Sequence, residues 1–149
     1  MVQPINLQTL YQQDYYQWLE MTLKQIKMKE LDNVDWEHLL EEIESLGREQ
    51  KHKVESYLRQ LLKHLLLYQY WQSEKVYCQR GWAEEIDNFR SELEILLRSQ
   101  TLYNYTESIL SSTYQKARRS AIIKSELTNF PFECPYSLKE ILDPQWLPN

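Results

Sequence analysis

Glycine is almost missing from this sequence, since its 149 residues include only Gly47 and Gly81. An average globular chain contains about 7% glycine. Glycine supplies backbone conformations with positive φ and lets the main chain approach a ligand closely. Its scarcity excludes the glycine-rich phosphate loops of Walker and Rossmann sites and the nucleophile elbow of α/β-hydrolases. The enzyme classes that depend on these loops are therefore excluded.

Cysteine and long apolar runs are also scarce. Cys78 and Cys134 have no second cysteine or histidine at the spacing of a zinc site. Residues 1–6 lack the charged and apolar regions of a signal peptide. The most apolar stretch, residues 61–68, is far shorter than the roughly 20 residues of a membrane span. We expect a cytoplasmic protein with reduced thiols and no membrane span.

The net charge of −5, from 17 Lys and Arg against 22 Asp and Glu, argues against nucleic acid as a partner. Some basic residues nevertheless gather locally, and these are Lys51, Lys53, Arg59, Arg118 and Arg119. A solvated helix face that also carries Glu49 and Glu55 is the simpler interpretation. A nucleic-acid-associated regulator that uses the basic patch remains the weaker alternative.

Apolar residues recur at helical spacing along nearly the whole chain, and no alternating strand pattern occurs. The pattern predicts helices over 6–28, 35–71, 82–98 and 104–126, with a polar linker over 72–81 and a packed tail over 130–149. Asn104 and Glu107 have the spacing of a capping box for the last long helix. We therefore expect one all-α domain over residues 1–149, a bundle of about four main helices.

The segment 35–71 is the predicted long central helix. Asp35 suits its N-cap, and an apolar stripe follows from Trp36. No apolar residue occurs from Gly47 to Lys53, so the helix either continues through this stretch or is hinged near 47–53. The stripe keeps its helical phase across the gap, which favours one long helix.

The tail holds four of the five prolines, at positions 131, 135, 144 and 148. Ser137 and Glu140 have capping-box spacing, and Tyr136 with Ile141 suits a hydrophobic staple. These signals predict one short helix that ends before Pro144. Because the tail is rich in apolar residues, we expect it to pack across the bundle.

Five segments of the chain form a specific combination, and they are Leu10–Leu19, Trp36–Gly47, Leu62–Leu66, Phe130–Tyr136 and Leu142–Pro144. This combination resembles the family known as domain of unknown function 29. The resemblance covers nearly the whole chain. It implies a mostly helical protein of cyanobacterial or other bacterial origin, and it supplies no catalytic residues because the family has no established activity.

An acidic cluster with one histidine is the main candidate for chemistry. His38, Glu41 and Glu42 share a helix face, and such side chains bind divalent metals in helical bundles. A further ligand from a facing helix is needed, and His64 is the candidate. In one straight helix Glu41 and His64 would lie roughly 35 Å apart, so they can meet only if the chain reverses near Gly47. A metal-dependent hydrolase or nuclease is therefore an alternative function, and apart from its divalent metal we expect no cofactor.

Aromatic residues make up 13% of the chain, and amphipathic aromatics are enriched at the centres of protein interfaces. The candidate interface residues are Tyr15, Trp18, Leu67, Tyr70 and Trp71. The favoured function is a non-catalytic protein-interaction or adaptor module that binds another protein or itself, as in a homodimer. Large rings that fill a glycine-poor core are the competing interpretation.

Overall fold

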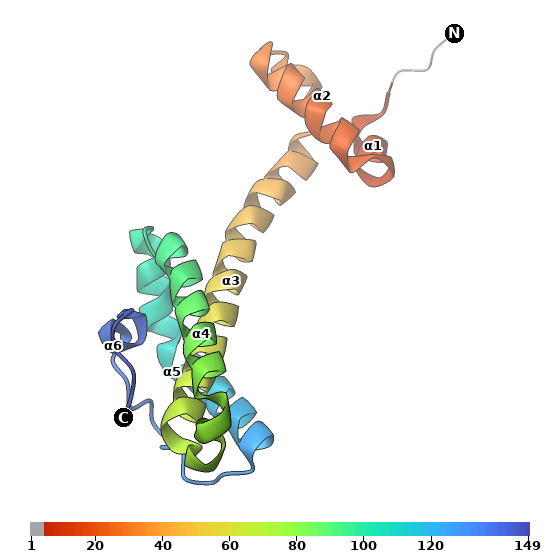
Figure 1. Ribbon diagram of the computed structural model, residues 1–149. Helices are drawn as coiled ribbons and strands as arrows, with labels where there is room; N and C mark the ends of the chain where they lie inside the picture. Colours follow the sequence, from red (N-terminus) through yellow and green to blue (C-terminus); the bar gives the residue numbers. More distant parts are fainter. Residues whose placement is uncertain (1–4) are drawn as a thin grey trace. The chain divides into compact units, whose positions relative to one another are not determined.

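The structure is a computed structural model that describes residues 5–149 (Figure 1). Residues 1–4 lie outside the described residues. They make up most of the segment 1–6, in which the sequence shows no signal-peptide features. The elements are α1 (Leu7–Gln13), α2 (Tyr15–Lys27), the 3-10 helix η1 (Leu31–Asn33), α3 (Trp36–Tyr70), α4 (Gln72–Leu96), α5 (Gln100–Ser125) and α6 (Leu138–Leu142). No strand occurs between residues 5 and 149, so the predicted all-α fold is confirmed.

The chain separates into two compact units, where the sequence predicted one domain. Unit 1 is Met1–Arg48, described from residue 5 onward, and unit 2 is Glu49–Asn149. The boundary falls in the polar stretch 47–53, where helix α3 has no apolar side chain to bury. Gly47 lies inside α3, and a Cβ atom there would meet nothing within 4 Å. The helix therefore does not require glycine at this position.

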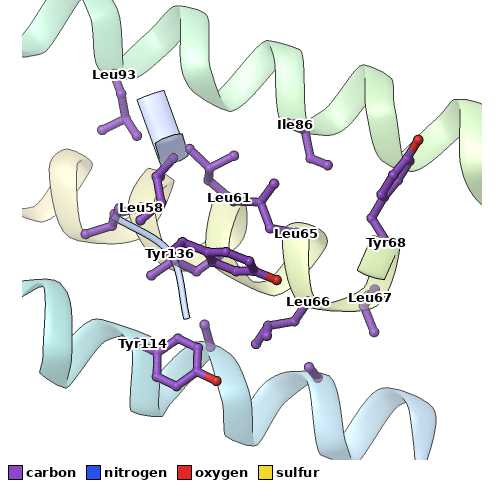
Figure 2. Packing of buried hydrophobic residues seen from close by; sticks show 14 of the residues in the cluster. Leu58, Leu61, Leu65, Leu66, Leu67, Tyr68, Ile86, Leu93, Tyr114 and Tyr136 are labelled. Atoms are coloured by element: carbon purple, nitrogen blue, oxygen red, sulfur yellow. The ribbon is translucent and has the colours of Figure 1, made fainter. Parts of the chain in front are cut away.

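Unit 2 is built around the second half of α3, with α4, α5 and the tail packed against it (Figure 1). The leucines of this half are fully buried, and they are Leu58, Leu61, Leu62, Leu65, Leu66 and Leu67. Figure 2 shows several of them among side chains of the other elements. These leucines lie on more than one side of α3, so the helix has to be covered by several other elements. Burying each leucine stabilises the fold by about 1.5–3 kcal/mol.

The tail is held by specific hydrogen bonds as well as by apolar contacts. The Tyr114 hydroxyl donates to the Pro131 carbonyl oxygen over 2.6 Å, and the Tyr136 hydroxyl donates to Gln69 Oε1 over 2.7 Å. Ser137 and Glu140 form the predicted capping box at the start of α6. The tail is thus part of the core of unit 2.

The first predicted helix, 6–28, is divided in two at Asp14. Asn6 caps α1 as expected, through its side chain and the backbone N–H groups of Gln8 and Thr9. Asp14 then leaves the helical conformation at φ −147°, and its carboxylate accepts from the Gln17 backbone N–H. Aspartate competes in this way for backbone donors, which makes it a better cap than an interior helix residue.

The expected linker 72–81 is helical, because α4 begins at Gln72 rather than at Trp82. The break lies one residue earlier, at Trp71, whose φ and ψ are −93° and 68°. The stretch contains no proline, and Gln, Glu and Lys favour helix even where a face is solvated. Polarity alone therefore gave the wrong boundary.

The last long helix begins at Gln100 rather than at Asn104. Ser99 is its N-cap, and its hydroxyl accepts from the Leu102 backbone N–H over 3.3 Å. The Asn104 side chain instead accepts from Gln100 Nε2 over 2.8 Å. Two capping signals lie five positions apart here, and the earlier one begins the helix.

Candidate interaction surface

A polar network in unit 1 joins α1 and α2 to the start of α3. Asp35 lies at its centre, with a side chain that is 1% exposed. Its Oδ2 atom accepts from Trp18 Nε1 over 3.2 Å and lies 2.6 Å from His38 Nδ1. Its Oδ1 atom accepts from the His38 backbone N–H over 3.4 Å. Asp35 therefore caps α3 and at the same time fixes Trp18.

Glu42 is the second acceptor of this network. Its two carboxylate oxygens accept from the hydroxyl groups of Tyr11 and Tyr15, the latter over 2.7 Å. The Tyr11 ring also stacks on His38, with ring centroids 4.0 Å apart, and meets Trp18 edge-on at 4.9 Å. The Asp35 and Glu42 carboxylates thus hold four aromatic side chains in place. These are Tyr11 of α1, Tyr15 and Trp18 of α2, and His38 of α3.

These contacts change the acidity of the groups involved. The hydrogen bond from Tyr11 lowers the pKa of Glu42, and the same bond raises the pKa of Tyr11 to about 12. The hydrogen bond to Asp35 raises the pKa of His38. Burial acts to raise the pKa of Asp35, but the hydrogen bonds from His38 and Trp18 lower it overall. The network is therefore strongest when the carboxylates and the imidazole are all charged.

Unit 1 should accordingly be most stable between pH 4.5 and 6.5, the ordinary values for Glu and His. The contribution of His38 is complete below 6.5 and is lost as the pH rises through its raised pKa. The contributions of Asp35 and Glu42 are complete above their ordinary values and are lost as the pH falls through their lowered pKa values. The stability of unit 1 at each pH can be measured by amide hydrogen exchange of the backbone N–H groups of α1 and α2. An alkaline decline that persists unchanged in His38→Gln would contradict it.

The residues considered for a metal site lie in different surroundings. His38 Nδ1 and both oxygens of Glu42 are engaged in the network, while Glu41 is exposed. His64 Nδ1 lies 2.7 Å from the Gln60 carbonyl oxygen, and burial lowers the pKa of His64. Within residues 5–149, no group of three or more His, Cys, Asp and Glu side chains is placed to hold a metal ion. Of the acidic cluster, the network therefore engages His38 and Glu42 and leaves Glu41 outside it.

The five interface candidates are distributed between core and surface. Trp18 and Leu67 are fully buried inside the chain, and Tyr70 and Trp71 are half-buried against the core of unit 2. Tyr15 is 45% exposed. Trp18 and Leu67 therefore act as core residues, because a side chain without exposed area cannot contact a partner in this conformation.

Most of the exposed apolar surface belongs to residues other than these five candidates. Among the described residues, twelve of the seventeen exposed large hydrophobic side chains lie in unit 1, which buries only Leu10, Trp18 and Val34. The exposed side chains follow helical spacing on two helices. We name as the exposed stripes Leu19, Leu23 and Ile26 of α2 together with Trp36, Leu40 and Ile43 of α3.

The predicted basic patch is divided by the fold. Lys51 lies over the Tyr105 ring, 5.1 Å from its centroid, and Arg118 Nε donates to the Pro131 carbonyl oxygen over 3.0 Å. Arg59 and Arg119 line two adjoining hollows between α3 and α5. Lys53 is exposed and lines neither of these two hollows. Lys116 from α5 joins Arg59 and Arg119 there.

No helix within residues 5–149 is long and apolar enough to cross a membrane. In comparisons with known proteins, no curated protein and no solved structure matched the chain. The family described as "Domain of unknown function DUF29" matches over residues 10–147, a range that includes parts of both units. The chain therefore belongs to the DUF29 family.

Proposed function

We propose that this protein is a protein-interaction module that associates with a second copy of itself through the exposed stripes of unit 1. The main observation behind this proposal is that unit 1 exposes far more hydrophobic side chains than it buries. Among the described residues it buries three and exposes twelve large ones. Single apolar residues scattered on a surface are normal, whereas clustered ones mark interaction sites. The polar network supports this role because it holds α1, α2 and α3 together without using the exposed stripes.

Charge complementarity favours a second copy as the partner. The stripe of α2 is accompanied by Glu20, Lys24 and Lys27, a side with net positive charge, and the stripe of α3 by Glu37, Glu41 and Glu44. If α2 of one copy packs on α3 of the other, lysines face glutamates at the rim while leucines and isoleucines meet at the centre. The same contact is then made twice about a two-fold axis, the commonest symmetry of soluble oligomers.

The test is the mass in solution, measured by light scattering for the whole chain. The wild type should exceed the 18.2 kDa of one chain, and the double variant Leu40→Glu, Ile43→Glu should return to that mass. Buried carboxylates without partners are strongly unfavourable, so the loss should be complete at micromolar concentration. The matched control is Val76→Glu, Tyr77→Glu, which changes two exposed apolar residues of α4 and should leave the mass unchanged.

Two results would contradict the proposal. A wild type that is monomeric at tens of micromolar would exclude the second copy as the occupant. A Leu40→Glu, Ile43→Glu variant that keeps the wild-type mass would show that the association uses another surface. Circular dichroism of each variant confirms that the helices are retained.

A further inference from the structure

A hollowed surface on unit 2 lies between α3 and α5, apart from the exposed stripes. One hollow of about 380 Å³ is lined by His52, Glu55, Ser56, Arg59 and Lys116. An adjoining hollow of about 370 Å³ is lined by Arg59, Lys116, Arg119, Ser120 and Ile123. Arg59 and Lys116 belong to both, so the two form one continuous feature that we name the α3/α5 groove.

Positive charge is concentrated along this groove although unit 2 as a whole is neutral, with thirteen Lys and Arg against thirteen Asp and Glu. Lys63 and Lys124 line neither hollow, but Lys63 lies close enough to Arg59 and Lys124 to interact with their charges. Burial lowers the pKa of Lys63, and the positive charges of Lys124 and Arg59 lower it further. The carboxylate of Glu55 lies within the groove and accepts from Lys116 Nζ over 2.6 Å.

Within the described part of the chain, the other cations of the groove form no ion pair, although Glu55 interacts electrostatically with Arg59 as well as with Lys116. Among the described residues, Arg59, Lys63, Arg119 and Lys124 form no ion pair within 4.0 Å, although Glu55 and Glu126 are close in sequence to some of them. Like charges that share a site disfavour one another's charged forms. A bound anion would remove this repulsion, so the groove is electrostatically suited to an anionic ligand.

The donors in the groove are those that recognise phosphate. Arginine presents a planar fork that matches two phosphate oxygens, and Ser56 and Ser120 add hydroxyl donors, one in each hollow. Of residues 5–149, no Tyr, Trp or Phe lines either hollow, so the His52 imidazole in the first hollow is the one ring there on which a nucleobase could stack. We propose that the α3/α5 groove binds a small ligand with two linked phosphate groups, centred on Arg59 and Lys116, the two cations that line both hollows.

The size of the groove and the charge of the chain favour a small ligand over a nucleic acid. Hollows of this volume are in the range of small-molecule sites. A long polyanion would also be repelled by the net charge of the chain, which is −5. Phosphate binding to a short basic groove avoids that repulsion.

Calorimetric titration of the whole chain with inorganic pyrophosphate at low ionic strength tests the proposal. We expect saturable binding with one ligand per chain, and weaker binding of orthophosphate, which carries less negative charge and fewer acceptor oxygens. The double variant Arg59→Ala, Arg119→Ala should bind pyrophosphate roughly a hundredfold more weakly, about tenfold for each charge-assisted contact. The control variant Lys53→Ala, Arg98→Ala removes two exposed cations outside the groove and should bind as the wild type does.

Three results would overturn the proposal. The first is that pyrophosphate shows no saturable binding. The second is that the Arg59→Ala, Arg119→Ala variant binds pyrophosphate as tightly as the wild type does. The third is that a competition titration shows preference for a DNA duplex over pyrophosphate. The last result would assign the groove to a nucleic-acid backbone. Titration with a nucleoside diphosphate tests whether the two phosphate groups belong to an inorganic or to an organic ligand. An affinity at least equal to that of pyrophosphate shows that the groove admits the nucleoside. Circular dichroism of both variants establishes that any loss of binding is local.

Discussion

Replacing Trp18 by alanine is expected to unfold unit 1 while unit 2 stays folded. Trp18 is fully buried, and its Nε1 atom donates to Asp35 over 3.2 Å. Tryptophan-to-alanine changes in a core cost about 3–5 kcal/mol. Unit 1 has only two other buried hydrophobic side chains, Leu10 and Val34, so it has little else to offset such a loss. The loss also leaves the buried Asp35 carboxylate with one donor fewer, which adds to the cost.

Amide hydrogen exchange measures the effect residue by residue. Protection should disappear in α1 and α2, and it should persist in α4 and α5, whose side chains pack around the second half of α3. The control is Tyr16→Ala on the same helix, since the Tyr16 side chain is 69% exposed and its removal should change stability by less than about 0.5 kcal/mol. Uniform loss of protection in both units would show that the two fold as one.

The helical class of the fold could be predicted because it depends on local signals. Apolar residues at helical spacing gave the long helices, and the Ser137–Glu140 capping box gave α6. The boundaries failed where two local signals competed. At Asp14 a side-chain cap prevailed over a continuous stripe, and at Ser99 one N-cap was chosen over another five residues later. The sequence pattern contains no measure of which signal is stronger.

The surfaces could not be predicted because they depend on which elements meet. Periodicity identifies the apolar stripe of Trp36, Leu40 and Ile43, but it does not say whether another helix covers that stripe. The basic patch shows the same limit. Arg59 and Lys116 lie far apart in sequence and line the same hollows only because α5 packs beside α3. Charge grouping along the chain therefore missed Lys63, Lys116 and Lys124.

Replacing Arg90 by methionine is expected to release α6 from α4 and to lower the free energy of unfolding by about 2–3 kcal/mol. Arg90 is 5% exposed, its Nε atom donates to the Ile141 carbonyl oxygen over 2.7 Å, and its Nη2 atom donates to that of Glu140 over 3.4 Å. Burial lowers the pKa of Arg90, and no salt bridge fixes its charge within the described residues. The two carbonyl oxygens at the end of α6 are its hydrogen-bond acceptors.

Methionine keeps much of the arginine's apolar length, so the change separates the hydrogen bonds from the packing. Exchange protection should fall at α6 and the residues after it, but the turn near Pro131 should keep its anchor, because the Tyr114 hydroxyl still donates there. Arg80→Met is the matched control, since Arg80 is an exposed arginine of the same helix and should leave urea unfolding unchanged. If α6 kept its protection in Arg90→Met, the apolar contacts of Leu138 and Ile141 would suffice to dock it. Loss of protection centred on α4 would instead show that Arg90 stabilises its own helix.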